Sequence, residues 1–207
     1  MRELPKWIRF RGYTGSDTVF RQESEKDYLL TLRIWLQHIL AVAVSRYGKR
    51  YGPWIISDIR FHDDVPCVWY PHPKGSYKVV VKIGNLCREN LSRACFQMAH
   101  ESIHLLSPSG RRDGTVLEEG LADIYSSAYM QEYFNEWRWR SADVRLELAS
   151  GRVRQFLSSY PDAIRVLRRR EPMLSRITAD LIKETYPDID PDFAKALTLP
   201  FPYEENA

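Results

Sequence analysis

The segment His100-Glu101-Ser102-Ile103-His104 carries the side chains best suited to chemistry in this chain. Two histidines four positions apart stand on the same face of a helix, so both imidazoles can reach one metal ion. Glu101 lies beside them, where its carboxylate can contact a metal-bound water without binding the metal itself. The pattern predicts a zinc site with His100 and His104 as ligands and Glu101 as general base.

A third protein ligand is expected, because catalytic zinc usually takes three and leaves one position for water. The segment from Leu117 to Tyr125 offers Glu119 and Asp123, which are four positions apart and share a helix face. One carboxylate can bind the metal while the other accepts a hydrogen bond from a ligating imidazole. Glu118 is a rival ligand, and two adjacent acids would also suit the first turn of a helix.

Two predicted helices must position these side chains. The first runs from about Asn90 to Leu106, and its apolar face excludes His100, Glu101 and His104. The second begins near Leu117 and continues to about Trp137, after a connection short enough to fold back antiparallel. The histidines and the carboxylates should therefore face each other.

The rest of the chain predicts an α+β fold with a small, mostly antiparallel sheet. A long helix is expected over 23–47, and β-strands over 54–61, 66–70 and 77–83, the last two joined as a hairpin. The region after residue 137 reads as helical pieces broken at Ser141, Gly151, Pro161, Pro172 and Pro187. We expect a metal-site core over 1–136 and a basic helical part over 137–207, packed on the same domain.

Composition favours an ordinary soluble protein. Hydrophobic residues make up 44% and charged residues 28%. No stretch approaches the roughly 20 apolar residues of a membrane span, and the charged N-terminus lacks the apolar segment of a secretory signal. Three scattered cysteines suit free thiols in a reducing compartment. The sequence therefore predicts a cytoplasmic location.

The positive charge is unevenly distributed. The net charge of +3 is too small to imply a nucleic-acid partner, but 137–176 holds ten arginines against four acids, a difference of +6. Solvated helix faces are one interpretation of this region. A basic surface that attracts an acidic protein or a nucleic acid is the other.

The two segments together resemble the gluzincin group of zinc metallopeptidases. HESIH followed by LEEGLADIY, within 94–130, is similar to motifs of the thermolysin-like enzymes, the zinc aminopeptidases and the short cytoplasmic peptidases that cleave phage-type repressors. The resemblance implies a zincin-like fold, selects Glu119 over Glu118 as zinc ligand, and implies that Asp123 supports His100. It also implies an antiparallel edge strand that holds peptide beside the cleft, either 79–83 or 68–70.

Two differences from the gluzincin group indicate which kind of peptidase to expect. The gap from His104 to Glu119 is shorter than in the large gluzincins, and no counterpart of the aminopeptidase motif for a substrate amino terminus is present. An endopeptidase is therefore expected, acting on a protein or peptide substrate. Its oxyanion needs a further donor, for which the candidates are Tyr125, Tyr129, Tyr160, Arg111 and Arg112.

A binding or regulatory module with the same fold is the alternative to an enzyme. In such a module the zinc would be structural, or a protein or nucleic-acid partner would be held but not cut. Structural zinc sites tend to have four protein ligands. The sequence offers three convincing ones, which favours catalysis.

Overall fold

The computed structural model of the chain describes residues 24–72, 76–111 and 113–203. Within these ranges, a small sheet early in the chain is surrounded and followed by helices, so the predicted α+β class is confirmed. The elements are α1 (Glu25–Tyr47), β1 (Ile55–His62), β2 (Cys67–Trp69), β3 (Lys78–Gly84), the 3-10 turn η2 (Asn85–Arg88), α2 (Leu91–His104), α3 (Val116–Phe134), α4 (Val144–Ser159), α5 (Ala163–Arg170), the 3-10 turn η3 (Leu174–Arg176), α6 (Ala179–Thr185) and α7 (Pro191–Thr198).

The described strands form one mixed sheet in the order β1-β3-β2. The predicted hairpin is confirmed, since β2 pairs antiparallel with β3, but β1 pairs parallel with β3 over a longer register. The expectation of a mostly antiparallel sheet is therefore wrong. After β1 the chain forms β2 at the opposite edge of the sheet. It then returns to form β3 between the two. Alternate β3 residues, Val79, Val81 and Ile83, face the main core.

Helix α1 begins and ends at residues suited to those positions. Ser24 caps its first turn by accepting a hydrogen bond from the Asp27 amide, and Gly48 ends it at φ 98°. By length and composition α1 could cross a membrane, contrary to the sequence expectation, although a core helix of a soluble protein passes the same test. Its inner face, including Leu32, Trp35 and Ile39, is buried in the core.

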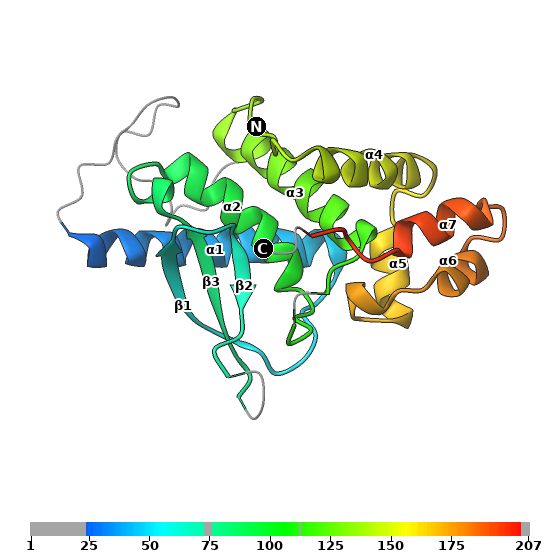
Figure 1. The fold of residues 1–207 in the computed structure, drawn as a ribbon, viewed down its shortest axis with the longest axis horizontal. Helices are drawn as coiled ribbons and strands as arrows, with labels where there is room; N and C mark the ends of the chain where they lie inside the picture. Colours follow the sequence, from blue (N-terminus) through cyan, green and yellow to red (C-terminus); the bar gives the residue numbers. More distant parts are fainter. Residues whose placement is uncertain (1–23, 73–75, 112, 204–207) are drawn as a thin grey trace.

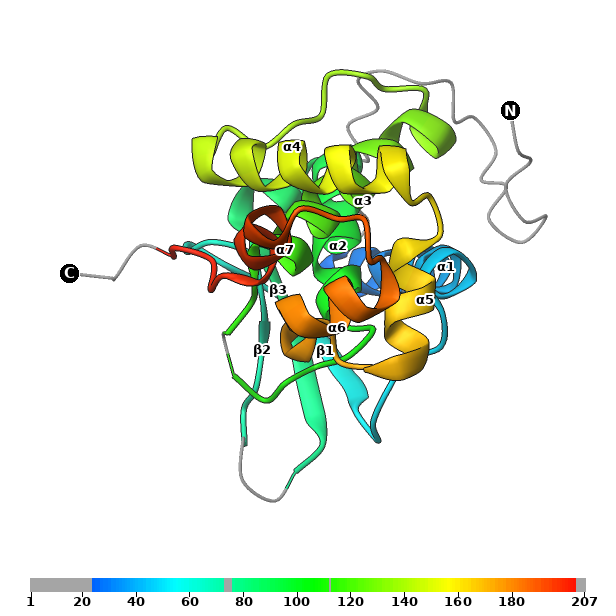
Figure 2. The same ribbon diagram turned by 90° about the vertical axis from the view of Figure 1, so that its right-hand side faces the viewer.

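Helices α3 and α4 lie above the strands in the view of Figure 1, whereas α5, α6 and α7 gather at the right-hand end of the molecule (Figures 1 and 2). Helix α2 packs against α1, β3 and α3, and α4 lies over α3. The close approach of α4 depends on Gly120, because a Cβ atom there would stand 2.5 Å from the Ala149 carbonyl oxygen. This packing brings the last turn of α2 and the first turn of α3 together at the edge of the sheet that β2 forms.

Of the expected breaks after residue 137, those at Ser141, Pro161, Pro172 and Pro187 lie between helices, and the one at Gly151 is wrong. Gly151 lies inside α4 rather than between helices, and a side chain there would meet open space. The glycine therefore weakens the helix without a neighbouring group that requires it. Buried residues of α4 to α7, such as Val153, Leu167 and Leu197, join the same core cluster as those of α2 and α3. The boundary between 1–136 and 137–207 stays a prediction.

Candidate metal centre

Helix α2 presents both histidines from its final turns. Their side chains are 18% and 17% exposed, so each is largely shielded yet reaches the surface of a cavity. The opposite side of the helix, with Ala94, Cys95 and Met98, is fully buried. The amphipathic pattern thus fixes which way His100 and His104 point.

The start of α3 brings two carboxylates to the same place. Thr115 caps the helix, with its hydroxyl accepting from the Glu118 amide and its carbonyl accepting from the Glu119 amide. Both glutamates are only 5% exposed. Acids in this first turn are favoured by the helix dipole, so the local fold and the site use the same residues.

His100, His104 and Glu119 converge on one point. Glu119 Oε2 lies 3.2 Å from His100 Nε2, and Glu119 Oε1 lies 3.4 Å from His104 Nε2. One possible ligand atom from each residue lies within 4.8 Å of the other two. Among the described residues, this is the group of histidine, cysteine and carboxylate side chains that could hold a metal ion.

The spacing of these atoms suits a tetrahedral ion. Two ligand atoms each about 2.1 Å from a tetrahedral metal lie roughly 3.4 Å from one another. The two separations between the Glu119 carboxylate and the imidazoles are close to this value. The separations between Glu119 and the two imidazoles are therefore compatible with a metal ion bound by this group.

Glu118 is turned away from this point of convergence and orients a histidine. Its Oε1 accepts a hydrogen bond from His104 Nδ1 at 2.9 Å. A hydrogen bond at Nδ1 fixes the imidazole so that Nε2 faces Glu119. Adjacent positions on α3 thus provide one carboxylate for each ring nitrogen of His104.

The electrostatics of the cluster favour a cation. Burial opposes the charged form of His104, but Glu119, Glu118 and Glu101 outweigh it and raise the pKa of the imidazole to about 10. Burial likewise opposes ionisation of Glu119, yet His104, His100 and Tyr203 lower the pKa of its carboxyl to about 2. The buried carboxylates therefore favour a positive charge in this cluster, whether a proton on the imidazole or a metal ion.

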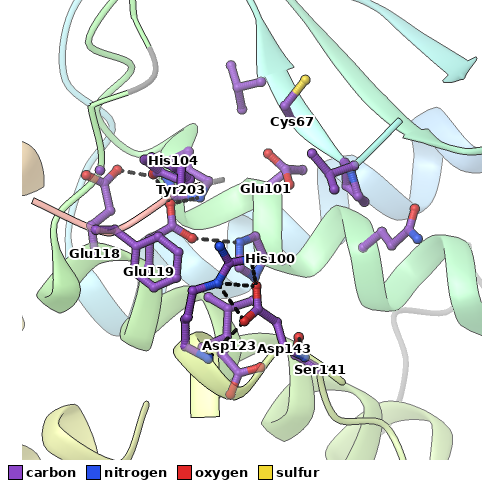
Figure 3. Close-up of a pocket in the computed structure, with 18 of the residues that line it drawn as sticks. Cys67, His100, Glu101, His104, Glu118, Glu119, Asp123, Ser141, Asp143 and Tyr203 are labelled. Carbon is purple, nitrogen blue, oxygen red and sulfur yellow. Dashed lines mark hydrogen bonds and ion pairs between the residues drawn. The ribbon is translucent and has the colours of Figure 1, made fainter. Parts of the chain in front are cut away.

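A cavity of about 510 Å³ opens onto the cluster. Glu101, which is 2% exposed, also lines it and lies on the side of the histidines toward Cys67 of β2 (Figure 3). One wall consists of residues 64–68 with Tyr70, from β2 and the chain around it, and the other of residues 139–143, 145 and 146 together with Phe201 and Tyr203. The histidines and acids thus lie at the base of an open site bordered by the sheet edge.

Asp123 lies at the cavity, but it does not hold His100 in this structure. The aspartate is 5% exposed, with its Oδ2 3.9 Å from Arg154 Nη2. Its Oδ1 is buried and has no hydrogen-bond partner among the described residues. The carboxylate that orients a histidine here is Glu118, and the histidine is His104. The sequence could not separate these roles, because Glu118 and Asp123 are both carboxylates in the first turns of the same predicted helix, close to the predicted ligand Glu119.

The structure brings few of the candidate oxyanion donors to the cavity. The Tyr125 hydroxyl donates to the Ile39 carbonyl, and the Tyr129 hydroxyl bonds to His38, so both tyrosines point into the core toward α1. Tyr160 packs against Tyr186 in the C-terminal helices. Arg111 lines the cavity with a 78% exposed side chain, and Arg112 lies outside the described residues.

Tyr203 is the site residue that the sequence did not indicate. Its hydroxyl donates a hydrogen bond of 2.5 Å to Glu119 Oε1, and the ring lines the cavity (Figure 3). The two residues are 84 positions apart, and Tyr203 belongs to no helix or strand. Neither periodicity nor motif spacing could connect them.

Comparison with known proteins adds no relative. No protein-family model, no curated protein and no solved structure matches this chain. The function of this chain is therefore inferred from the residues of the site and their geometry.

Proposed function

We propose that this protein is a zinc-dependent metallopeptidase with a zincin-like core of the gluzincin type. The observation that carries the proposal is the convergence of His100, His104 and Glu119, with carboxylate-to-imidazole separations of 3.2 and 3.4 Å, at the base of a cavity that Glu101 also lines. The resemblance of the HESIH and LEEGLADIY segments to gluzincin motifs gives the same four residues.

We propose zinc as the metal bound by this donor set. Two imidazoles and one carboxylate are the three protein ligands of many catalytic zinc sites, which leave a position open. A site of oxygen donors alone would favour magnesium or calcium instead. When bound, zinc would supply a water of lowered pKa and polarise the carbonyl group of the substrate.

Glu101 is suited to act as general base. It follows His100 directly on α2, yet it is not one of the three residues whose ligand atoms converge. This position would allow its carboxylate to contact a metal-bound water without being a ligand of the metal. In the proposed reaction Glu101 accepts the proton of the attacking water and passes it to the leaving amine.

The edge strand β2 is the proposed binding element for an extended peptide. Among the described strands β2 has one neighbour, β3, and its residues Cys67 and Val68 line the cavity. An edge strand can pair with an extended chain through backbone hydrogen bonds. This arrangement supports 68–70, rather than the central 79–83, as the substrate-binding edge.

A cytoplasmic location is part of the same proposal. Cys67, Cys87 and Cys95 are all free thiols, and burial raises the pKa of the Cys87 thiol to about 12. Free cysteines are common in reducing compartments.

The change Glu101→Gln tests the proposal. We expect the variant to keep its zinc and its fold but to lose nearly all hydrolysis, because an amide cannot accept the water proton. The zinc-loaded wild type and variant are incubated with a protein-derived peptide library, and cleavage is read by mass spectrometry. Glu147→Gln, an exposed change on α4, is the matched control and should cleave like wild type.

The same comparison can be made in the source cell, where fragments present with wild type and absent with Glu101→Gln identify the substrate. If Glu101→Gln and wild type behave alike in both settings while both hold zinc, the peptidase proposal is wrong. A zinc-dependent binding module would then be the better explanation.

A further inference from the structure

The last described residues of the chain lie against the segment that begins α3. The Val116 amide donates to the Leu199 carbonyl at 3.0 Å, and the Phe201 amide donates to the Gly114 carbonyl at 2.9 Å. Between these bonds, Thr115 and Pro200 form an antiparallel bridge. Residues 199–203, here called the C-terminal strap, are therefore held to the same short stretch that positions Glu118 and Glu119.

The C-terminal strap is also anchored by a small apolar cluster of its own. Phe201 is 7% exposed and packs with Val116 of α3 and Ala149 of α4. The Tyr203 ring lies 5.1 Å from the Phe201 ring, with Leu146 also packed against the cluster. This packing fixes where the tyrosine hydroxyl can reach.

That hydroxyl reaches the carboxylate of the third metal-ligand candidate. Tyr203 donates to Glu119 Oε1 at 2.5 Å, and the same oxygen lies 3.4 Å from His104 Nε2. The other oxygen, Oε2, faces His100 at 3.2 Å. The hydrogen bond from Tyr203 therefore fixes the rotation of the carboxylate about its own axis.

Gly114 makes this approach possible. A Cβ atom at this position would stand 2.2 Å from the Tyr203 hydroxyl and 2.7 Å from Glu119 Oε1. Real Cβ atoms do not come so close to an oxygen, so any side chain here would displace the tyrosine or the glutamate. The backbone, the C-terminal strap and the ligand carboxylate thus meet at one crowded point.

We propose that Tyr203 is a positioning residue of the metal centre, and that the C-terminal strap completes this centre when it docks against the start of α3. The inference rests on the metal site of the proposed function. A glutamate has a long side chain with several rotatable bonds, so an unheld carboxylate must be ordered when a metal binds. Partners that hydrogen-bond a ligating carboxylate remove this cost.

The change Tyr203→Phe tests the inference, because it removes one hydroxyl and leaves the ring. Zinc affinity is measured on the full-length protein by competition with a chromophoric chelator. We expect the affinity to fall about 10–100-fold, the usual loss for such outer partners. The absorption spectrum of the cobalt-loaded protein should also change, since it reports the arrangement of the ligands.

Tyr125→Phe is the matched control. It makes the same change on α3, but its hydroxyl bonds to the Ile39 carbonyl, and neither residue is among those that line the cavity. Any loss of stability from removing a buried hydroxyl should appear in this variant too, while zinc affinity and the cobalt spectrum stay as in wild type. Thermal unfolding of the metal-free proteins separates a loss of folding from a loss of metal binding.

Wild-type zinc affinity and an unchanged cobalt spectrum in Tyr203→Phe would overturn the inference. So would an equal loss of affinity in Tyr125→Phe, or a wild-type protein that binds neither metal, which would overturn the proposed metal site as well. The peptidase proposal can fail alone: if Glu101→Gln proves to have no effect on cleavage while Tyr203→Phe weakens zinc binding, the role of Tyr203 stands.

Discussion

Two charged side chains, Arg168 and Glu119, are equally well buried in this protein but have different kinds of partner. Among the residues that the structure describes, the Arg168 guanidinium donates to backbone carbonyl oxygens alone, those of Tyr47, Gly48, Lys49, Leu106 and Pro172. Glu119 is instead surrounded by side chains that can exchange protons or rotate: His100, His104 and Tyr203.

The difference shows which buried charges indicate chemistry. Carbonyl groups cannot change charge, and together they occupy the donors of Arg168, which joins the end of α1 to the end of α2. Glu119 lies at an open cavity among groups whose pKa values are shifted. Burial of a charge alone is therefore weak evidence for function, whereas the type of partner and access to a cavity are strong evidence.

The arginines of the region 137–176 also differ in whether they have partners within the chain. Of its ten arginines, five have partners within the chain: Arg145, Arg154, Arg165, Arg168 and Arg170. Part of the positive charge that the sequence shows therefore stabilises the fold. An acidic partner for the remaining exposed arginines stays a prediction, which a steep dependence of binding on salt would support.

The largest expected effect is the loss of bound zinc when His100, His104 or Glu119 is changed. Purified protein should hold about one zinc per chain, and His104→Ala should abolish this because two remaining ligands bind the metal poorly. His100→Ala should do the same, and Glu119→Ala should weaken binding strongly. Metal content by mass spectrometry after dialysis checks all three. Loss of zinc in Glu118→Ala, with zinc retained in Glu119→Ala, would show that the ligand is one residue earlier.

Arg168→Met should lower the stability of the protein and leave its zinc binding unchanged, the opposite of what is expected for the ligand variants. The variant removes the donor that Arg168 supplies to four partly buried carbonyl groups, those of Tyr47, Gly48, Lys49 and Pro172, so we expect the free energy of unfolding to fall by about 1–3 kcal/mol. Zinc content should stay at the wild-type level under conditions where the variant is folded. Urea unfolding together with metal analysis measures both, and a loss of zinc without a loss of stability would contradict the contrast between the two buried charges.

A smaller effect is expected at the carboxylates that surround the ligands. Glu118→Ala removes the acceptor of His104 Nδ1 and should lower zinc affinity about 10–100-fold without unfolding the protein. Asp123→Ala is the informative comparison. The sequence predicts a similar loss for it, whereas the observed contacts favour Glu118 as the orienting residue. Chelator competition on both variants shows which carboxylate supports a histidine.

Local patterns predicted the elements that carry the site. Apolar residues at helical spacing indicated α2 and α3, and the turn-rich segment between β2 and β3 indicated their hairpin. The predicted ligands His100, His104 and Glu119 do come together, because their positions follow from helix geometry and one short connection. These are interactions within or between neighbouring elements.

Long-range contacts were the part that sequence reasoning missed. The parallel pairing of β1 with β3 depends on the path of the whole sheet. Tyr125 and Tyr129 have the right residue type for oxyanion donors, but their hydroxyls are satisfied by α1, which no local pattern reveals. Tyr203 reaches Glu119 only because the C-terminal strap folds back onto α3. Such contacts need the tertiary structure.

The smallest expected effect comes from Arg170, two positions after Arg168 in the same run of arginines. Successive side chains on a helix point in different directions, so Arg168 enters the core while Arg170 pairs with Glu184 at the surface. Both members of this pair are about half exposed, and such pairs contribute under about 1 kcal/mol. Arg170→Ala should therefore shift the urea midpoint only slightly, less at high salt, and leave zinc content unchanged. If it destabilises the protein as much as Arg168→Met does, the carbonyl contacts of Arg168 are not what makes that residue important. The stability of this region would then depend on the charge of the arginine run as a whole.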